Sequence, residues 1–449
     1  MPTKYGVPRY TAFRVPRPRL SRAASKEARR SAVLLVAPPG YGKTVLLAEV
    51  VEELADPLVW LQLDENDNDP IAFVSALSEG TRRSFPEVAE RLGRLDFTDT
   101  NGHGERLLAM VMNVFEDVGV GAWTMVIDDL HLIANPRTLA LVAKLVEFPP
   151  PGLALLIASR IQPSLPLHRW VAQGAIRLFD IDDLRFTPEE ARAWLRRDLP
   201  GLSDDAVGQL LERTEGWGAG LYLASGLLSG GTDGKSLAER LTGSNPVVGG
   251  YLMDEVFVRQ SEELQEFLLS SAVLPQFDAA SCSELLGITL ARCERLIDQL
   301  KRQQAFLQPL DAEGRWYRYH SLFQEFLLGR LTRQAGKRAA ELRVAAGHLA
   351  ETRGQLVAAV GFYLEADDRV AAANLLENEG MAILNQGRAE ALHRWLQQLG
   401  DEVAVSPRLQ LLLGRVLRRL GRPQAASSVL KGVGDEADPR TLSAARTEL

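Results

Sequence analysis

The stretch VLLVAPPGYGKTVLL, residues 33–47, nearly matches the phosphate-loop pattern G-x-x-x-x-G-K-[ST], with Ala37 in place of the first glycine. A short apolar run at residues 31–37 has the composition of a buried parallel strand, and leucines and valines recur with helical spacing over residues 44–54. Strand, loop and helix in this order predict a nucleotide site. Gly40 and Gly42 let backbone N–H groups face a phosphate, so Ala37 puts only the local turn in question.

Two further predicted strands end in polar residues. AWTMVIDDLH, residues 122–131, predicts a strand in which Asp128 holds Mg²⁺ and Asp129 orients or deprotonates the attacking water; a solvated acidic turn is the alternative. LALLIASR, residues 153–160, ends in Arg160, which can sense a γ-phosphate at this edge of a sheet; a surface arginine is the alternative. His131 has no evident partner, and we interpret it as structural.

The pattern of elements predicts a multidomain α/β plus α fold with a parallel P-loop NTPase sheet covered by helices on both faces. The remaining strands of the sheet are expected at residues 57–63 and 175–181. The glycines of TEGWGAGL, residues 214–221, allow a close approach to the sheet domain. We expect four domains: a nucleotide-binding domain at 1–185, a helical lid at 186–248, a winged-helix domain at 249–332 and a helical-repeat arm at 333–449.

Two local patterns support the last two domains. Short helices and a hairpin with strands at 306–310 and 316–319 predict the winged helix, in which His320 starts the next helix. Gly354, Gly387 and Gly421 are 33 and 34 residues apart, a spacing typical of tetratricopeptide-like repeats. We interpret the middle copy, at residues 381–392, as lacking the earlier glycine of the other two, which makes the repeat weak.

The composition excludes several classes of protein. No apolar run is long enough for a membrane span, and no secretory signal follows the basic N-terminus. The only two cysteines, Cys282 and Cys293, fit a reducing cytoplasm and match no common zinc spacing. DENDNDP, residues 64–70, lacks the glycine and glutamate of a calcium loop, so we interpret it as a polar turn. Residues 1–30 carry nine basic residues and one acid in a chain of net charge −7, so the acidic remainder should bind nucleic acid poorly.

Together and in this order, the motifs resemble the maltose-regulon activator (MalT) group of LuxR-type regulators, which are signal-transduction ATPases with numerous domains (STAND). The resemblance covers essentially all 449 residues. The resemblance rests on seven stretches of sequence: VPRPRL (15–20), APPGYGKT (37–44), WLQLDENDNDP (60–70), VIDDLHLI (126–133), DDLRFTPEEA (182–191), TEGWGAGL (214–221) and WYRYHSLF (316–323). In that family the first loop position is commonly a small non-glycine residue, as Ala37 is. Pro39 departs from the usual alanine, and so does the glycine after Trp217.

The resemblance implies a role for each matching residue. Those expected to flank adenine are Val15, Pro16, Arg17, Arg19 and Leu20. Those expected to bind phosphate from the loop are Pro39, Gly40, Tyr41, Gly42, Lys43, Thr44 and Val45. Thr44 and Asp128 would hold Mg²⁺, and Lys43 and Asp129 would serve hydrolysis. Arg160 would sense the γ-phosphate, and His320 would touch a nucleotide phosphate and lock the resting state.

The resemblance therefore implies a cytoplasmic ATP/ADP switch that is closed with ADP. ATP together with an inducer would promote opening and self-association, and slow hydrolysis would reset it. The family's inducer sensor and DNA-binding helix-turn-helix do not fit in this chain, so we expect the natural protein to continue and to bind inducer and DNA downstream. Two alternatives stay open: a constitutively active ATPase or kinase, and a protein-binding scaffold with a structural nucleotide.

Overall fold

The computed structural model describes residues 4–8, 15–92, 104–198, 202–228, 241–303, 306–431 and 443. The chain forms two compact units. The first unit comprises Met1–Arg259, Asp298–Leu307 and His320–Phe323. The second unit comprises Gln260–Ile297, Gln308–Tyr319 and Gln324–Leu449. The four domain boundaries expected from the sequence stay predictions.

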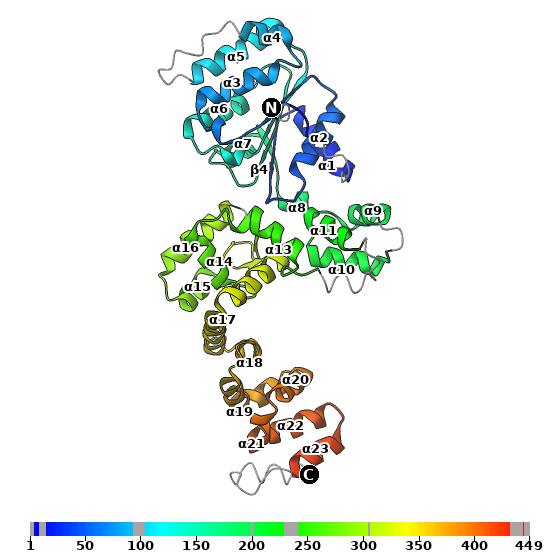
Figure 1. Cartoon of the computed structure of the whole chain (residues 1–449), viewed down its shortest axis with the longest axis vertical. Coiled ribbons are helices and arrows are strands. Elements are labelled where there is room, and N and C mark those ends of the chain that lie inside the picture. The colour runs from blue at the N-terminus through cyan, green and yellow to red at the C-terminus, as the bar shows by residue number, and fades with distance from the viewer. Residues whose placement is uncertain are drawn as a thin grey trace. The chain divides into compact units, whose positions relative to one another are not determined.

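The first unit is built on a five-stranded sheet in which every pairing is parallel, in the order β2-β3-β4-β1-β5 (Figure 1). The strands are β1 (Ala32–Val36), β2 (Leu58–Gln62), β3 (Trp123–Asp128), β4 (Leu153–Ser159) and β5 (Ile176–Phe179). This confirms the parallel sheet and the approximate position of each predicted strand. Since β1 and β3 both pair with β4, the carboxyl ends of these three strands meet at one edge of the sheet.

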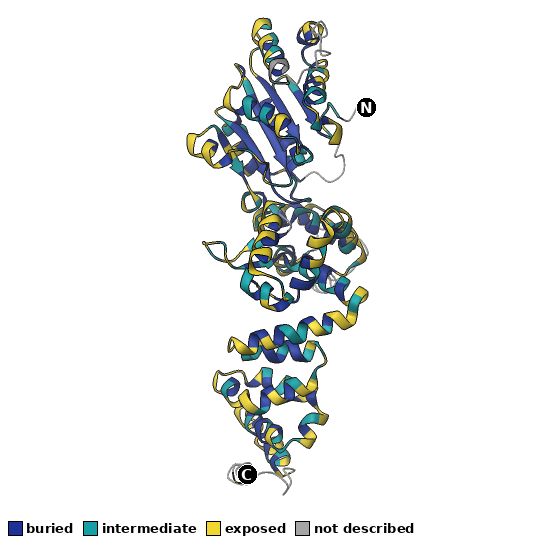
Figure 2. Cartoon of the chain, turned by 90° about the vertical axis from the view of Figure 1, so that its left-hand side faces the viewer, coloured by how far each residue is buried: buried dark blue, intermediate teal, exposed yellow. Residues whose placement is uncertain are grey.

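The strands are buried because helices cover both faces of the sheet (Figures 1 and 2). On one face lie α1 (Pro18–Ala28) and α2 (Lys43–Leu54). On the other lie α3 (Pro70–Thr81), α5 (Gly104–Val118) and α6 (Pro136–Glu147).

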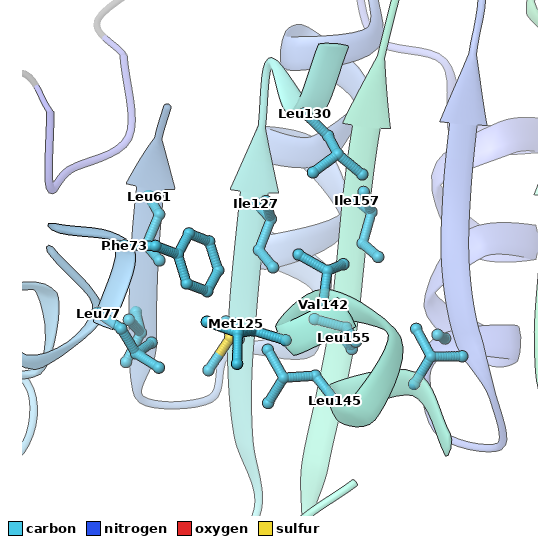
Figure 3. Close-up of a cluster of buried hydrophobic side chains, with 14 of the residues drawn as sticks. Leu61, Phe73, Leu77, Met125, Ile127, Leu130, Val142, Leu145, Leu155 and Ile157 are labelled. Atoms are coloured by element: carbon cyan, nitrogen blue, oxygen red, sulfur yellow. The ribbon is translucent and has the colours of Figure 1, made fainter. Parts of the chain in front are cut away.

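Figure 3 shows the core between the sheet and the second group of helices. Leu61, Met125 and Leu155 point from three neighbouring strands toward Phe73 of α3 and Val142 of α6. Burying one such side chain stabilises the fold by roughly 1.5–3 kcal/mol relative to leaving it in water. Packing of these apolar strands therefore fixes the position of their carboxyl ends, where Asp128 and Arg160 lie.

The remaining helical elements of the first unit are mostly short. They are η1 (Glu65–Asn68), α4 (Pro86–Leu92), η2 (Leu130–Leu132), α7 (Leu167–Gln173), α8 (Ile181–Leu184), α9 (Pro188–Asp198), α10 (Asp204–Thr214), α11 (Gly218–Leu228), α13 (Pro246–Leu252) and η3 (Met253–Phe257). The last of these, η3, is a single π-helical segment that continues α13.

Part of the basic N-terminal segment covers the β2 edge of the sheet. The amide of Gln62 donates to the carbonyl oxygen of Lys4 at 3.0 Å. The Lys4 ammonium group lies 2.8 Å from a carboxylate oxygen of Asp64 and 2.8 Å from one of Asp67. Lys4 thus offsets part of the negative charge of the acidic turn at residues 64–70. Residues 1–3 and 9–14 of this segment lie outside the described residues.

The second unit contains helices and a small hairpin. The elements that lie in it wholly or partly are α14 (Glu262–Ser271), α15 (Ala279–Leu286), α16 (Leu290–Arg302), β6 (Leu307–Pro309), β7 (Tyr317–Tyr319), α17 (Ser321–Thr352), α18 (Leu356–Glu365), α19 (Arg369–Asn385), α20 (Ala389–Leu399), α21 (Asp401–Val405), α22 (Pro407–Arg419) and α23 (Pro423–Lys431). The predicted hairpin is confirmed, and Phe277 adds an antiparallel bridge to Tyr317. Cys282 and Cys293 are buried free thiols.

The helical arm explains the spacing of its glycines. Gly354, Gly387 and Gly421 have positive φ angles of 69°, 80° and 72°, and each lies in a turn between two helices. A second series lies seven residues earlier, at 347, 380 and 414, and a Cβ atom on any of these glycines would meet a side chain within 2.6 Å. The interpretation that the middle repeat lacks its earlier glycine was therefore wrong, because Gly380 stands directly before that stretch.

Candidate functional site

The loop between β1 and α2 requires glycine at two positions and not at a third. Gly40 and Gly42 have φ angles of 82° and 79°, in the left-handed region that strains any side chain. Ala37 is not among the residues with positive φ. The alanine at the first pattern position is therefore unstrained, which answers the doubt that the sequence raised about this turn.

The start of α2 leaves room for an anion. Gly42 is the N-cap of α2 and has no side chain to bond the first-turn N–H groups. A Cβ atom built on Gly42 would meet no atom within 4 Å, so the space beside the N-cap is open. Backbone N–H groups at a helix start together with open space fit a phosphate group.

Lys43, the first residue of α2, places its ammonium group inside the loop. Its Nζ donates to the carbonyl oxygens of Ala37 at 2.6 Å and Pro38 at 3.0 Å. Burial, followed by the positive charge of Arg160, lowers the pKa of Lys43 to about 8. A nearby phosphate would restore the preference for the charged form, so this lysine suits an anionic ligand.

Asp128, the last residue of β3, is a buried carboxylate with one unbonded oxygen. Its Oδ1 accepts the amide of Asp129 at 2.9 Å, whereas its Oδ2 has no hydrogen-bond partner among the described residues. Burial, and then the charge of Asp129, raises its pKa to about 6, and the nearby Thr44 hydroxyl opposes the rise. A buried unpaired carboxylate oxygen near a threonine hydroxyl fits a hard cation such as Mg²⁺.

Asp129 lies where several polar side chains converge. Its φ of 60° is in the left-handed region, which is uncommon outside glycine and frequent at functional sites. Its Oδ2 accepts from Gln62 at 3.4 Å, and its Oδ1 lies 3.8 Å from Nδ1 of His131 and 4.0 Å from Nε of Arg160. Burial lowers the pKa of His131 to about 4, so its ring is neutral at pH 7. The sequence indicated neither Gln62 nor the proximity of His131 to a carboxylate.

Arg160, directly after β4, has its shortest ion pair with a residue that the sequence analysis missed. Its Nη1 donates to Oε2 of Glu255 at 2.6 Å, and Arg259 donates to the same oxygen at 3.3 Å. Glu255 is 95 residues away in the chain and belongs to η3. No motif in the sequence marks it.

A downstream segment hydrogen-bonds the backbone of the phosphate loop. The indole Nε1 of Trp217 donates to the carbonyl oxygen of Pro39 at 3.0 Å, and the amide of Ala219 donates to that of Gly40 at 2.9 Å. A Cβ on Gly218 would lie 3.1 Å from the Gly40 oxygen, which confirms that a glycine of this stretch allows a close approach. We call Trp217 and Ala219 the loop clasp.

His320 is buried among aromatic rings and bonded to a backbone carbonyl. Its Nε2 lies 2.8 Å from the carbonyl oxygen of Thr214, and its Nδ1 accepts the amide of Leu322 at 3.3 Å. These bonds assign the proton to Nε2. The ring stands edge-on to Trp217 and Phe306. The structure therefore places His320 next to the loop clasp, and its expected contact with a phosphate stays a prediction.

The segment expected to flank adenine makes polar contacts with residues 183–190. Arg17 donates to the carbonyl oxygens of Leu184 and Arg185 at 2.7 Å each and to a carboxylate oxygen of Glu190 at 3.1 Å. Arg19 reaches the same carboxylate at 3.3 Å. A cavity of about 440 Å³ adjoins this segment and is lined by Pro16, Arg17, Pro18, Ser21, Glu49, Glu52 and Glu53. The adenine role of these residues stays a prediction.

The other expected site residues lie as follows. Val15, Leu20 and Tyr41 are buried, Pro16 is exposed, and Pro39, Thr44 and Val45 are intermediate. The Tyr41 ring packs against Phe306 with centroids 6.2 Å apart, and burial raises the pKa of its hydroxyl well above the ordinary value. The structure thus brings the phosphate loop, Asp128, Asp129 and Arg160 together. His320 lies next to the loop clasp.

Comparison with known proteins bears on the fold and on the family resemblance. Residues 26–161 match the AAA domain family, and residues 253–339 match the MalT winged helix domain. The serine/threonine-protein kinase PknK of Mycobacterium tuberculosis is 32% identical over 95% of this chain and 39% of its own length. The HTH-type transcriptional regulator MalT of Cronobacter sakazakii is 27% identical over 96% of this chain and 48% of its own. The chain thus spans less than half of these curated relatives.

A solved Walker-type ATPase of Pyrococcus abyssi has a similar fold, with a TM-score of 0.50 at 14% identity over 72% of this chain and 97% of that one. These findings confirm the resemblance to MalT-type regulators and the expected fold class. The P-loop AAA fold also implies nucleotide binding. Within the ranges that the structure describes, no helix has the length and apolarity needed to cross a bilayer.

Proposed function

We propose that this chain is the nucleotide-operated switch of a MalT-like regulator, resting with ADP and activated with ATP. One observation carries the proposal: downstream residues bond the groups that would meet phosphates. The loop clasp holds two loop carbonyls, and Glu255 holds Arg160. A ligand that binds better when these bonds are rearranged shifts the molecule toward the rearranged state.

The chemistry of each residue suggests its part in the proposed switch. The amides at the start of α2 and the Lys43 ammonium group bind the phosphates. Thr44 and Asp128 hold Mg²⁺, which when bound would neutralise phosphate charge. Asp129 orients or deprotonates a water, and Arg160 binds the terminal phosphate of ATP. Hydrolysis is slow in this proposal and resets the switch.

His320 supports the closed state in the proposal. It bonds the carbonyl oxygen of Thr214, and the adjacent Ser321 amide donates to Glu215 at 3.0 Å. These two bonds hold the start of α17 at the carboxyl end of α10. We propose that opening breaks them and exposes surfaces for self-association.

The relatives favour a control module over a self-contained enzyme. One relative is named a protein kinase and another a transcriptional regulator, and each contains a segment similar to this chain. A segment shared by proteins with such different outputs is suited to sensing the state of a nucleotide. In this proposal an inducer and DNA are bound by other regions of a longer protein.

The first experiment is to denature freshly purified protein and identify the released nucleotide by chromatography. Stoichiometric ADP from the wild type and its loss in Lys43→Ala would support the switch. The control is Lys337→Ala in α17, a lysine whose side chain is 93% exposed, and this variant should retain the ADP. Rapid ATP turnover without an inducer would favour the constitutively active ATPase instead. Partner binding by nucleotide-free Lys43→Ala would favour the scaffold, and a wild type that binds neither ADP nor ATP would reject the proposal.

A further inference from the structure

Helix α13 and the segment η3 that continues it each present one side chain to the expected phosphate site. The segment η3 is π-helical, a rare geometry that recurs at functional sites. Tyr251 and Glu255 are four residues apart, so they occupy the same side of this helical segment. The Tyr251 hydroxyl lies 2.9 Å from the position of a Cβ built on Gly40, and Glu255 bonds Arg160.

Glu255 holds Arg160 more closely than Asp129 does. The distance from the Arg160 guanidinium to Glu255 is 2.6 Å, against 4.0 Å to Asp129. Both partners are partly buried, with side-chain exposures of 25% for Arg160 and 31% for Glu255, so solvent weakens this ion pair only in part. Burial alone would raise the pKa of Glu255, but its bonds and charge interactions with Arg160 and Arg259 lower it, so Glu255 is ionised at neutral pH.

We propose that Glu255 is a specificity-determining residue that competes with the terminal phosphate of a nucleoside triphosphate for Arg160. This inference rests on the proposed function. A diphosphate has no group that needs Arg160, so it binds with the ion pair intact. A triphosphate must take the guanidinium from Glu255 or share it, and its own negative charge is repelled by the carboxylate. Glu255 therefore favours the diphosphate over the triphosphate.

The test is to measure dissociation constants of the full chain for ADP and for a non-hydrolysable ATP analogue by calorimetry. Glu255→Gln keeps the side-chain shape and removes the charge. The ratio of the triphosphate constant to the diphosphate constant should fall about tenfold, the order of one charge-assisted hydrogen bond. The matched control is Asp254→Asn, because Asp254 is an exposed neighbouring acid. Its ratio should stay within twofold of the wild type.

Arg160→Gln makes the test specific, because without the guanidinium only the repulsion between the carboxylate and the triphosphate remains, and Glu255→Gln should lower the ratio much less than in the wild-type background. Glu255→Asp, with a shorter carboxylate, should lower it in the same direction and serves if the glutamine variant does not fold. An unchanged ratio in a folded variant that binds both nucleotides would overturn the role of Glu255 and leave the proposed function intact. Failure of the wild type to bind either nucleotide would instead reject the proposed function.

Discussion

Adding a single methyl group to Gly40 tests the loop clasp. In Gly40→Ala the new Cβ would lie 2.6 Å from both the Ala219 Cβ and the Trp217 Nε1, and the residue would keep a φ of 82°. Gly42→Ala is the matched control, because it carries nearly the same φ of 79° but its Cβ would meet nothing within 4 Å. Only Gly40→Ala therefore combines backbone strain with a steric clash.

The two costs can be estimated separately. A left-handed conformation costs an alanine roughly 1–2 kcal/mol, and both variants bear this cost. Overpacking in a closely packed region adds about 1–3 kcal/mol, and only Gly40→Ala bears it. The free energy of unfolding should therefore fall by about 1–2 kcal/mol in Gly42→Ala and by about 2–5 kcal/mol in Gly40→Ala.

The assay is urea unfolding without nucleotide, monitored by tryptophan fluorescence. The slope of the free energy of unfolding against urea concentration should be the same in both variants, because it reports how much surface becomes exposed. Limited proteolysis under native conditions gives an independent measure of whether residues 214–221 have lost their contacts with the phosphate loop, because a detached segment is cut faster. If the two variants have equal stability within about 0.5 kcal/mol, the clasp does not pack on Gly40 as described.

Three further predictions concern the site and the segment at residues 15–20. Asp129→Ala should keep ATP affinity within a few-fold while losing most hydrolysis; loss of ATP binding in calorimetry would contradict the separate roles of the two acids. Asp128 has a pKa raised from 3.8 to about 6, so its contribution to stability is complete below pH 4 and is lost as the pH rises through 6. Without metal or nucleotide, Asp128→Asn should be about 2–3 kcal/mol more stable than the wild type at pH 7.5 and equal to it below pH 4, as measured by urea unfolding. In Arg17→Lys the lysine has no planar group that can bond two carbonyls and a carboxylate at once, so the free energy of unfolding should fall by about 1–3 kcal/mol, as measured by thermal and urea unfolding. A loss of nucleotide affinity at unchanged stability would show instead that the main role of Arg17 is in binding.

Sequence reasoning found the sheet because its signal is local. Apolar runs of about seven residues, each ending in a turn, can only be buried between layers of helices, and the parallel order brings their polar ends together. Lys43, Asp128 and Arg160 therefore follow from position in a strand or at a helix start. The effect of Ala37 on the loop could not be predicted in the same way, because the need for glycine at this position depends on a φ angle that the sequence does not state.

The remaining features depend on contacts between distant residues. Arg17 bonds carbonyls about 167 positions later, and His320 bonds one 106 positions earlier. Backbone carbonyls carry no sequence signal, so neither contact could be read from residue types. Glu255 was missed for a related reason: an acid on a polar helix is ordinary until an arginine from another element is placed beside it.

The division of the chain into two units has a consequence for its synthesis. The first unit takes residues from three separate stretches, and the last of these ends at Phe323. Phe306 and His320, which pack around Trp217, leave the ribosome about 100 residues after it. At about 5–20 residues per second this is a delay of roughly 5–20 s, during which Trp217 lacks these neighbours. The sheet can form early in translation, whereas the surroundings of the loop clasp are completed only after most of the winged-helix region has been made.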